Sequence, residues 1–138
     1  MVEAVNKTPW HLWAVGVLSL LWNAIGCYIY TMTMLRDPSL MASAPPEMLD
    51  ALDAAPVWAD AAWALGVWGA LLGSVFLLLR RSWAVPAFVV SLIGLLGTTI
   101  WQANAGIPMN VPQAAMIWVI ALFLLWYAWM MRRRCVLR

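Results

Sequence analysis

The sequence predicts an all-α membrane protein, a bundle of four transmembrane helices. Of its 138 residues, 65% are hydrophobic and only 10% are charged, and the mean hydropathy is +0.84. Soluble globular domains carry about 25% charged residues. Four apolar runs, over residues 12–35, 57–79, 83–101 and 113–131, are each about long enough to cross the ~30 Å hydrocarbon core of a bilayer. We therefore expect a single integral membrane domain over residues 1–138.

The second and third runs are joined by Arg80, Arg81 and Ser82, and a link this short and charged predicts a tight turn at a membrane face. Lys and Arg in short loops are retained on the cytoplasmic side of a membrane. The fourth run also ends in arginines, Arg132, Arg133 and Arg134. With both arginine groups inside, four spans place both termini in the cytoplasm. The basic tail is the ordinary retention signal, so no nucleic-acid partner is expected.

The first span, residues 12–35, contains no charged residue. A signal peptide is an alternative, because Ala42-Ser43-Ala44 resembles a small-residue cleavage site. However, the run is longer than the ~7–15 residues of a signal-peptide apolar core, and Pro45 would directly follow the cut. We therefore expect an uncleaved transmembrane helix.

The loop at residues 36–56 predicts a short amphipathic helix on the periplasmic surface. Pro45 and Pro46 favour a helix start, since proline is tolerated in a first turn. In such a helix the apolar and acidic side chains lie on opposite faces, Met48, Leu49 and Leu52 against Glu47, Asp50 and Asp53. An alternative role for this acidic loop is a recognition or lid element.

Small residues predict how the spans pack, because transmembrane helices associate through close contacts at such residues. The first span carries a stripe at spacings of three and four: Gly16, Ser19, Asn23, Gly26 and Tyr30. The second span carries another, which includes a GxxxG motif: Ala62, Gly66, Gly69 and Gly73. We expect these two stripes to face each other. The fourth span has few small residues, so we expect it to face lipid or another copy of the protein.

Two tryptophans, Trp22 and Trp68, lie near the middle of their spans, away from the interfacial belts where tryptophan is common. A mostly apolar cavity with a few polar groups is typical of small-molecule sites. The predicted ligand-binding residues are Trp22, Asn23, Trp68, Ser91 and Thr98. The alternative is a tight core in which Asn23 bonds a neighbouring helix.

Asp60 lies at the start of the second span, where a negative charge suits a helix N-terminus. The alternative is a proton or cation site, because intramembrane acids are often functional. No catalytic triad, paired inward carboxylates, phosphate-binding glycine loop or metal-ligand cluster is present in the sequence. We therefore expect no enzyme activity, no metal and no cofactor, and we expect Cys27 and Cys135 to be free thiols.

Several segments resemble a family of small bacterial inner-membrane proteins, mostly uncharacterised, of which some members carry an automatic sugar-transporter label. The segments are Thr8-Pro9-Trp10-His11-Leu12-Trp13, Leu21-Trp22-Asn23-Ala24-Ile25-Gly26, residues 64–74 and residues 79–86. The resemblance implies four spans and a bacterial inner membrane. Family members often have an aspartate where this chain has Ile29, so a proton-coupled role for that acid does not carry over.

Two functions are compatible with these patterns. The first is binding or transport of a small molecule, with the site shared between copies of a homo-oligomer, since four short spans leave little room within one copy. The second is an accessory or assembly subunit that docks on a larger membrane protein complex through its GxxxG face or its fourth helix.

Overall fold

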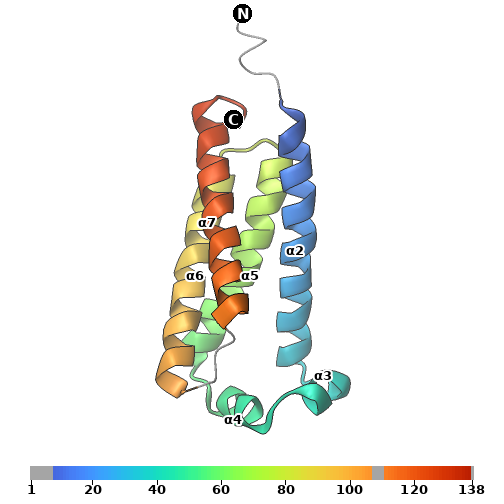
Figure 1. Ribbon diagram of the computed structural model, residues 1–138, viewed down its shortest axis with the longest axis vertical. Coiled ribbons are helices and arrows are strands. Elements are labelled where there is room, and N and C mark those ends of the chain that lie inside the picture. The colour runs from blue at the N-terminus through green and yellow to red at the C-terminus, as the bar shows by residue number, and fades with distance from the viewer. Residues whose placement is uncertain (1–7, 107–110, 138) are drawn as a thin grey trace, which may run out of the picture.

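The computed structural model describes residues 8–106 and 111–137, and in this part of the chain all regular structure is helical (Figure 1). Four helices are long and apolar enough to cross a membrane: α2 (Trp10–Met34), α5 (Val57–Leu78), α6 (Ala84–Ala105) and α7 (Val111–Arg133). Two short helices, α3 (Pro38–Ser43) and α4 (Pro46–Ala54), connect α2 to α5 at the end of the bundle opposite the start of α2 and the end of α7. The predicted all-α bundle of four membrane-spanning helices is confirmed.

Proline and glycine mark several helix ends. α2 begins at Trp10, earlier than expected, because Pro9 stands at its N-cap in an extended conformation. α6 continues past Trp101 to Ala105 and ends at Gly106, which adopts a left-handed conformation with φ of 69°. Part of the loop expected before the fourth span, residues 107–110, lies outside the described residues.

The tightest helix pair is α5 with α6, and glycines of both helices make it so. A Cβ added to Gly94 would lie 2.5 Å from both the carbonyl oxygen of Ala62 and the amide nitrogen of Gly66. A Cβ added to Gly69 would lie 3.2 Å from the amide nitrogen of Ser91. The two backbones are therefore in direct contact, as small-residue interfaces in membranes allow.

This pairing corrects one expectation: the glycine stripe of α5 faces α6, not the stripe of α2. α2 packs on another side of α5, where Gly26 lies near the side chain of Val67. The physical reason is that α2 contacts α5 through polar side chains, Asn23 and Cys27, which need space to reach backbone carbonyls. The turn between α5 and α6 is short, so these two helices are neighbours. α6 has no side chain at Gly94, so it can pack directly against the glycine stripe of α5.

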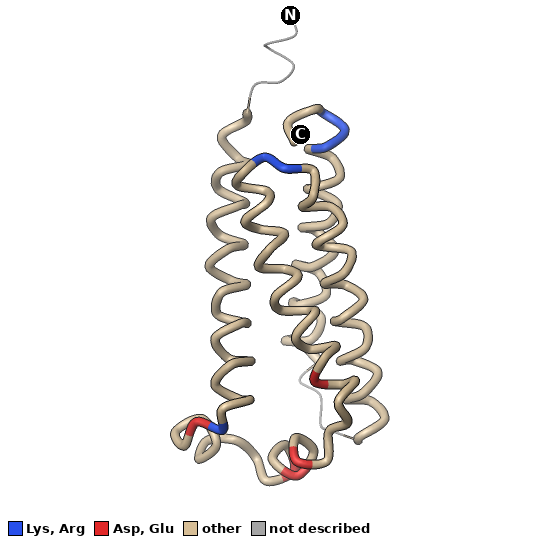
Figure 2. The backbone as a smooth tube through the Cα atoms, turned by 180° about the vertical axis from the view of Figure 1, so that it is seen from behind, with Lys and Arg blue, Asp and Glu red and all other residues tan. Residues whose placement is uncertain are grey.

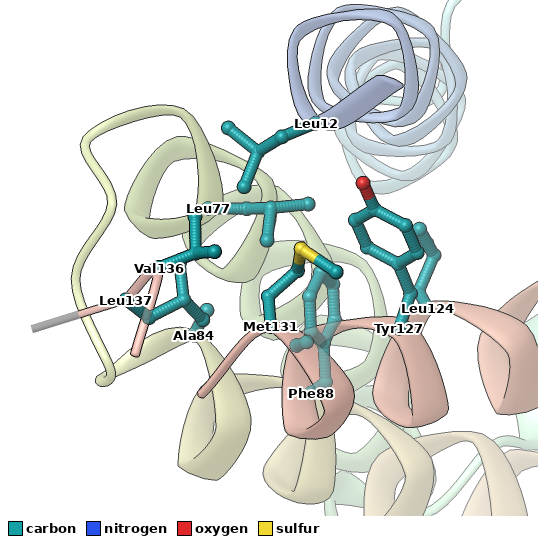
Figure 3. Close-up of a cluster of buried hydrophobic side chains, with 10 residues drawn as sticks. Leu12, Leu77, Ala84, Phe88, Leu124, Tyr127, Met131, Val136 and Leu137 are labelled. Atoms are coloured by element: carbon teal, nitrogen blue, oxygen red, sulfur yellow. The ribbon is translucent and has the colours of Figure 1, made fainter. Parts of the chain in front are cut away.

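Buried apolar side chains gather at the end of the bundle where α2 begins and α7 ends (Figure 3). Leu12 of α2, Leu77 of α5 and Met131 of α7 are fully buried there. His11 hydrogen-bonds Tyr127 through its Nδ1 and joins α2 to α7. The tail after α7 turns back over this cluster and buries Val136 and Leu137. The contacts at this end therefore join α7 to α2, α5 and α6.

Helices α2, α5 and α7 end in the same backbone motif, in which a residue with positive φ closes the last turn. These residues are Arg36, Arg80 and Cys135, with φ of 55°, 56° and 61°. At the end of α7 the Val136 amide donates to the Met131 carbonyl at 3.0 Å, and the Cys135 amide donates to the Arg132 carbonyl at 3.0 Å. Both bonds define a Schellman motif, whose left-handed position favours glycine.

Replacing Cys135 by glycine is expected to stabilise the protein by about 0.5–1 kcal/mol, because the strain of a left-handed β-carbon exceeds the added freedom of the unfolded chain. The Cys135 side chain is exposed, so little packing is lost. The measurement is thermal unfolding in mild detergent. Cys135→Ala is the control, since it keeps the β-carbon and should leave the midpoint unchanged; an equal gain from both variants would contradict the strain argument.

Candidate functional site

Asn23 lies at the interface of α2 and α5 and is 7% exposed. Its Nδ2 donates to the Ala70 carbonyl at 3.0 Å and to the Ser74 Oγ at 2.8 Å. The Ser74 hydroxyl in turn donates to the Ala70 carbonyl at 3.1 Å, and the Cys27 thiol donates to the Val67 carbonyl at 3.3 Å. Asn23 thus takes part in a polar contact that joins two helices.

Ser91 belongs to a different interface, that of α5 with α6. Its hydroxyl donates to the Gly66 carbonyl at 2.7 Å and its side chain is buried. Thr98 bonds within its own helix, donating to the Gly94 carbonyl at 3.0 Å. Neither hydroxyl shares a partner with Asn23.

Trp22 and Trp68 lie on the surface of the bundle, with 37% and 44% of their areas exposed. The five predicted ligand-binding residues are therefore spread over two helix interfaces and the outer surface, and the structure does not bring them around one cavity. In the described part of the chain, every fully buried side-chain nitrogen and oxygen has a hydrogen-bond partner. Asn23 instead bonds the neighbouring helix α5, which was the alternative to a ligand site.

Shallow apolar hollows, open to the surface of the bundle, lie instead between α6 and α7, along a strip that we call the α6–α7 groove. One hollow, of about 390 Å³, is lined by Val85, Val89, Leu122, Leu125, Trp126 and Trp129. A second, of about 240 Å³, continues it from Val89, Leu122 and Leu125 to Leu96 and Trp118. The Trp118 indole donates to the Thr99 hydroxyl at 3.3 Å and links the two helices beside the groove.

Sequence reasoning missed this groove. The signal was present in the fourth span, where Ala114, Ala121 and Ala128 are spaced seven apart among bulky side chains. Such a helix cannot approach its neighbour as closely as a glycine-bearing one. α7 therefore packs on α6 with hollows between large residues, whereas α5 and α6 leave no comparable space at Gly94.

Asp60 lies in the first turn of α5, where a negative charge is favourable, and it is partly exposed. Within residues 8–106 and 111–137, no three His, Cys, Asp or Glu side chains gather into a group that could hold a metal ion.

The acidic residues within the described part of the chain lie toward the end of the bundle formed by α3 and α4 (Figure 2). Arg36 at the end of α2 pairs with Asp53 of α4 at 2.9 Å. Asp37 caps α3, and hydrogen bonds from the Ser39 hydroxyl and then the Leu40 amide lower the pKa of its carboxyl. In α4 the acids are exposed and the apolar residues are half-buried, as its amphipathic pattern predicts. 

The arginines of the α5–α6 turn and of the end of α7 lie together at the opposite end (Figure 2). Arg80 donates a hydrogen bond to the Thr8 hydroxyl. The guanidinium of Arg133 lies over the Trp129 ring, 4.8 Å from its centroid. Among the residues that the structure describes, positive and negative groups are thus segregated to the two ends of the bundle, with Arg36 as the exception.

Comparisons with protein-family models, with curated proteins and with solved structures found no match to this chain.

Proposed function

We propose that this small polytopic membrane protein is an accessory subunit that packs against a larger membrane protein. The observation that supports this proposal is that the buried polar side chains of the described residues are all hydrogen-bonded within the protein. A carrier needs polar groups directed at its cargo. This chain uses Asn23 and Ser91 to hold its own helices together and presents apolar faces outward. The proposal includes no catalytic step, no metal and no cofactor.

The face that we assign to the partner lies on α2. This helix packs along its length on α5 and leaves much of its circumference exposed. Leu18, Leu21, Ile25 and Tyr28 are between 57% and 68% exposed and recur at spacings of three and four. This is the spacing with which one helix interlocks with another. We therefore propose that a transmembrane helix of the partner packs along this stripe.

The test is purification from the native membrane in gentle detergent, followed by native mass spectrometry. We expect a foreign membrane subunit to be retained by the wild type and lost from Leu21→Trp, because the larger ring disrupts the stripe. Val119→Trp on α7 is the matched control, since Val119 is 65% exposed on another helix. A protein that leaves the membrane without any foreign subunit would overturn the proposal.

A second candidate is binding or transport of a small molecule by a homo-oligomer. It is favoured by Trp22 and Trp68, which remain partly exposed near mid-membrane and would be enclosed by a second copy. The same mass spectrum separates the two candidates. A multiple of this chain that retains a small molecule, and loses it in Trp22→Leu, would support this candidate and not the first.

We also propose a bacterial inner-membrane location with both termini in the cytoplasm, as the resemblance and the segregation of charge suggest. Cys135 is exposed in the tail and Cys27 is buried, so a membrane-impermeant maleimide reports the side of the tail without mutation. We expect no labelling of Cys135 in intact cells and labelling after lysis. The control is Ala42→Cys with Cys135→Ser, which should react in intact cells; the reverse pattern would invert the orientation.

A further inference from the structure

Five arginines, Arg80, Arg81, Arg132, Arg133 and Arg134, concentrate positive charge at one end of the bundle (Figure 2). The ion pair formed among the described residues, Arg36 with Asp53, lies at the other end. None of the carboxylates in residues 8–106 and 111–137 pairs with the five. This end therefore has positive charge available for an anion from outside the described chain.

The α6–α7 groove begins at this same end. The part of the groove nearest the arginines is lined by Val85, in the first turn of α6, and by Trp129, one turn before Arg133. From Val85 to Leu96 the groove runs about 16 Å along α6, at 1.5 Å per residue. That length matches one leaflet, about half of the ~30 Å hydrocarbon core. An apolar strip of this length fits an acyl chain.

Arg133 connects the charge to the groove. Its guanidinium is stacked on Trp129, which is itself a lining residue, so the charge is held at the groove's mouth. A guanidinium presents paired N–H donors that match a phosphate. Basic pockets between helix ends at the cytoplasmic face are known to bind anionic lipid headgroups.

We propose that the α6–α7 groove is a binding site for an anionic phospholipid. The acyl chain lies along Val89, Leu122 and Leu125, and Arg133 holds the phosphate. The combination of an apolar groove with a cation at its end favours this occupant. An uncharged helix would fill the groove but would provide no anion for Arg133. A zwitterionic lipid would bring its own cation close to the arginine cluster.

The first test reconstitutes the protein in bilayers of equal parts phosphatidylglycerol and phosphatidylcholine, extracts it in mild detergent and identifies the retained lipid by native mass spectrometry. We expect phosphatidylglycerol to be enriched, and Arg133→Gln to lower the enrichment about fivefold. Arg132→Gln is the matched control, because it removes the same charge from the same exposed end and has no ring contact. Equal losses in both variants, or no preference for phosphatidylglycerol in the wild type, would overturn the proposal.

The second test fills the groove. Leu122 is 52% exposed, so Leu122→Trp should fold and occupy the space of the acyl chain. We expect this variant to lose the retained lipid, while Leu72→Trp, an equal change at a residue of α5 that is also 52% exposed, keeps it. If Leu122→Trp retains as much lipid as the wild type, the lipid does not bind in the groove and the proposal is wrong. Neither test depends on a partner protein, so the result is independent of the proposed accessory role.

Discussion

Gly94→Ala is expected to destabilise the protein by about 2–3 kcal/mol, the cost of overpacking a close contact. The new methyl group would lie 2.5 Å from the Ala62 carbonyl oxygen and from the Gly66 amide, and 3.0 Å from the Gly66 Cα. These are backbone atoms, which cannot rotate out of the way as a side chain can. α5 and α6 would have to separate, and the bond from Ser91 to the Gly66 carbonyl would lengthen with them.

The measurement is the midpoint of thermal or denaturant unfolding in one detergent. Gly66→Ala is the matched control on the facing helix, because its nearest neighbour, the Leu95 amide nitrogen, is 3.5 Å from the added carbon. That distance is ordinary van der Waals contact, so we expect little change. If Gly66→Ala and Gly94→Ala lower the midpoint equally, the two backbones are not in the contact described.

Asn23→Leu is expected to destabilise the protein by about 1–3 kcal/mol, since it removes two interhelical hydrogen bonds, each worth about 0.6–1.7 kcal/mol in membrane proteins. Leucine has a similar size, so the loss reflects the bonds to Ala70 and Ser74 more than a cavity. The loss should occur in the absence of any ligand.

Thr98→Val is the control, because Thr98 bonds only to Gly94 of its own helix. We expect its unfolding midpoint to stay close to the wild type. If Asn23→Leu and Thr98→Val have the same unfolding midpoint, Asn23 does not join α2 to α5. That result would reopen the hypothesis that the Asn23 amide binds a ligand.

The candidate site shows which feature could not be predicted from the sequence, namely the helix face that each residue occupies. The polar residues Asn23 and Ser91 were identified as important, but their grouping with Trp22 and Trp68 assumed that mid-membrane residues of adjacent spans converge. A helix has several faces, and depth along the helix does not say which face a residue occupies. Asn23 points to α5 and Trp22, one position earlier, is partly exposed.

The close pairing of glycines shows the same limit. The spacing of Gly66, Gly69 and Gly73 predicts a face that packs closely, and the structure has one. Its partner is Gly94 of α6 rather than the stripe of α2. A small-residue stripe fits any neighbour that is equally small, so the sequence leaves the choice open.

The apolar runs and the residues between them are enough to predict an all-helical chain, four helices long and apolar enough to span a membrane, and charged residues grouped at opposite ends of those helices. These properties are local, because they follow from the length of each apolar run and from the residues between runs. The three-dimensional structure is needed to see which helix faces meet, that the tail folds back over Leu12 and Leu77, and that a shallow groove lies between α6 and α7. Those properties depend on contacts between residues far apart in the chain, and the strength of such contacts depends on the fit of two surfaces, which no single run of residues specifies.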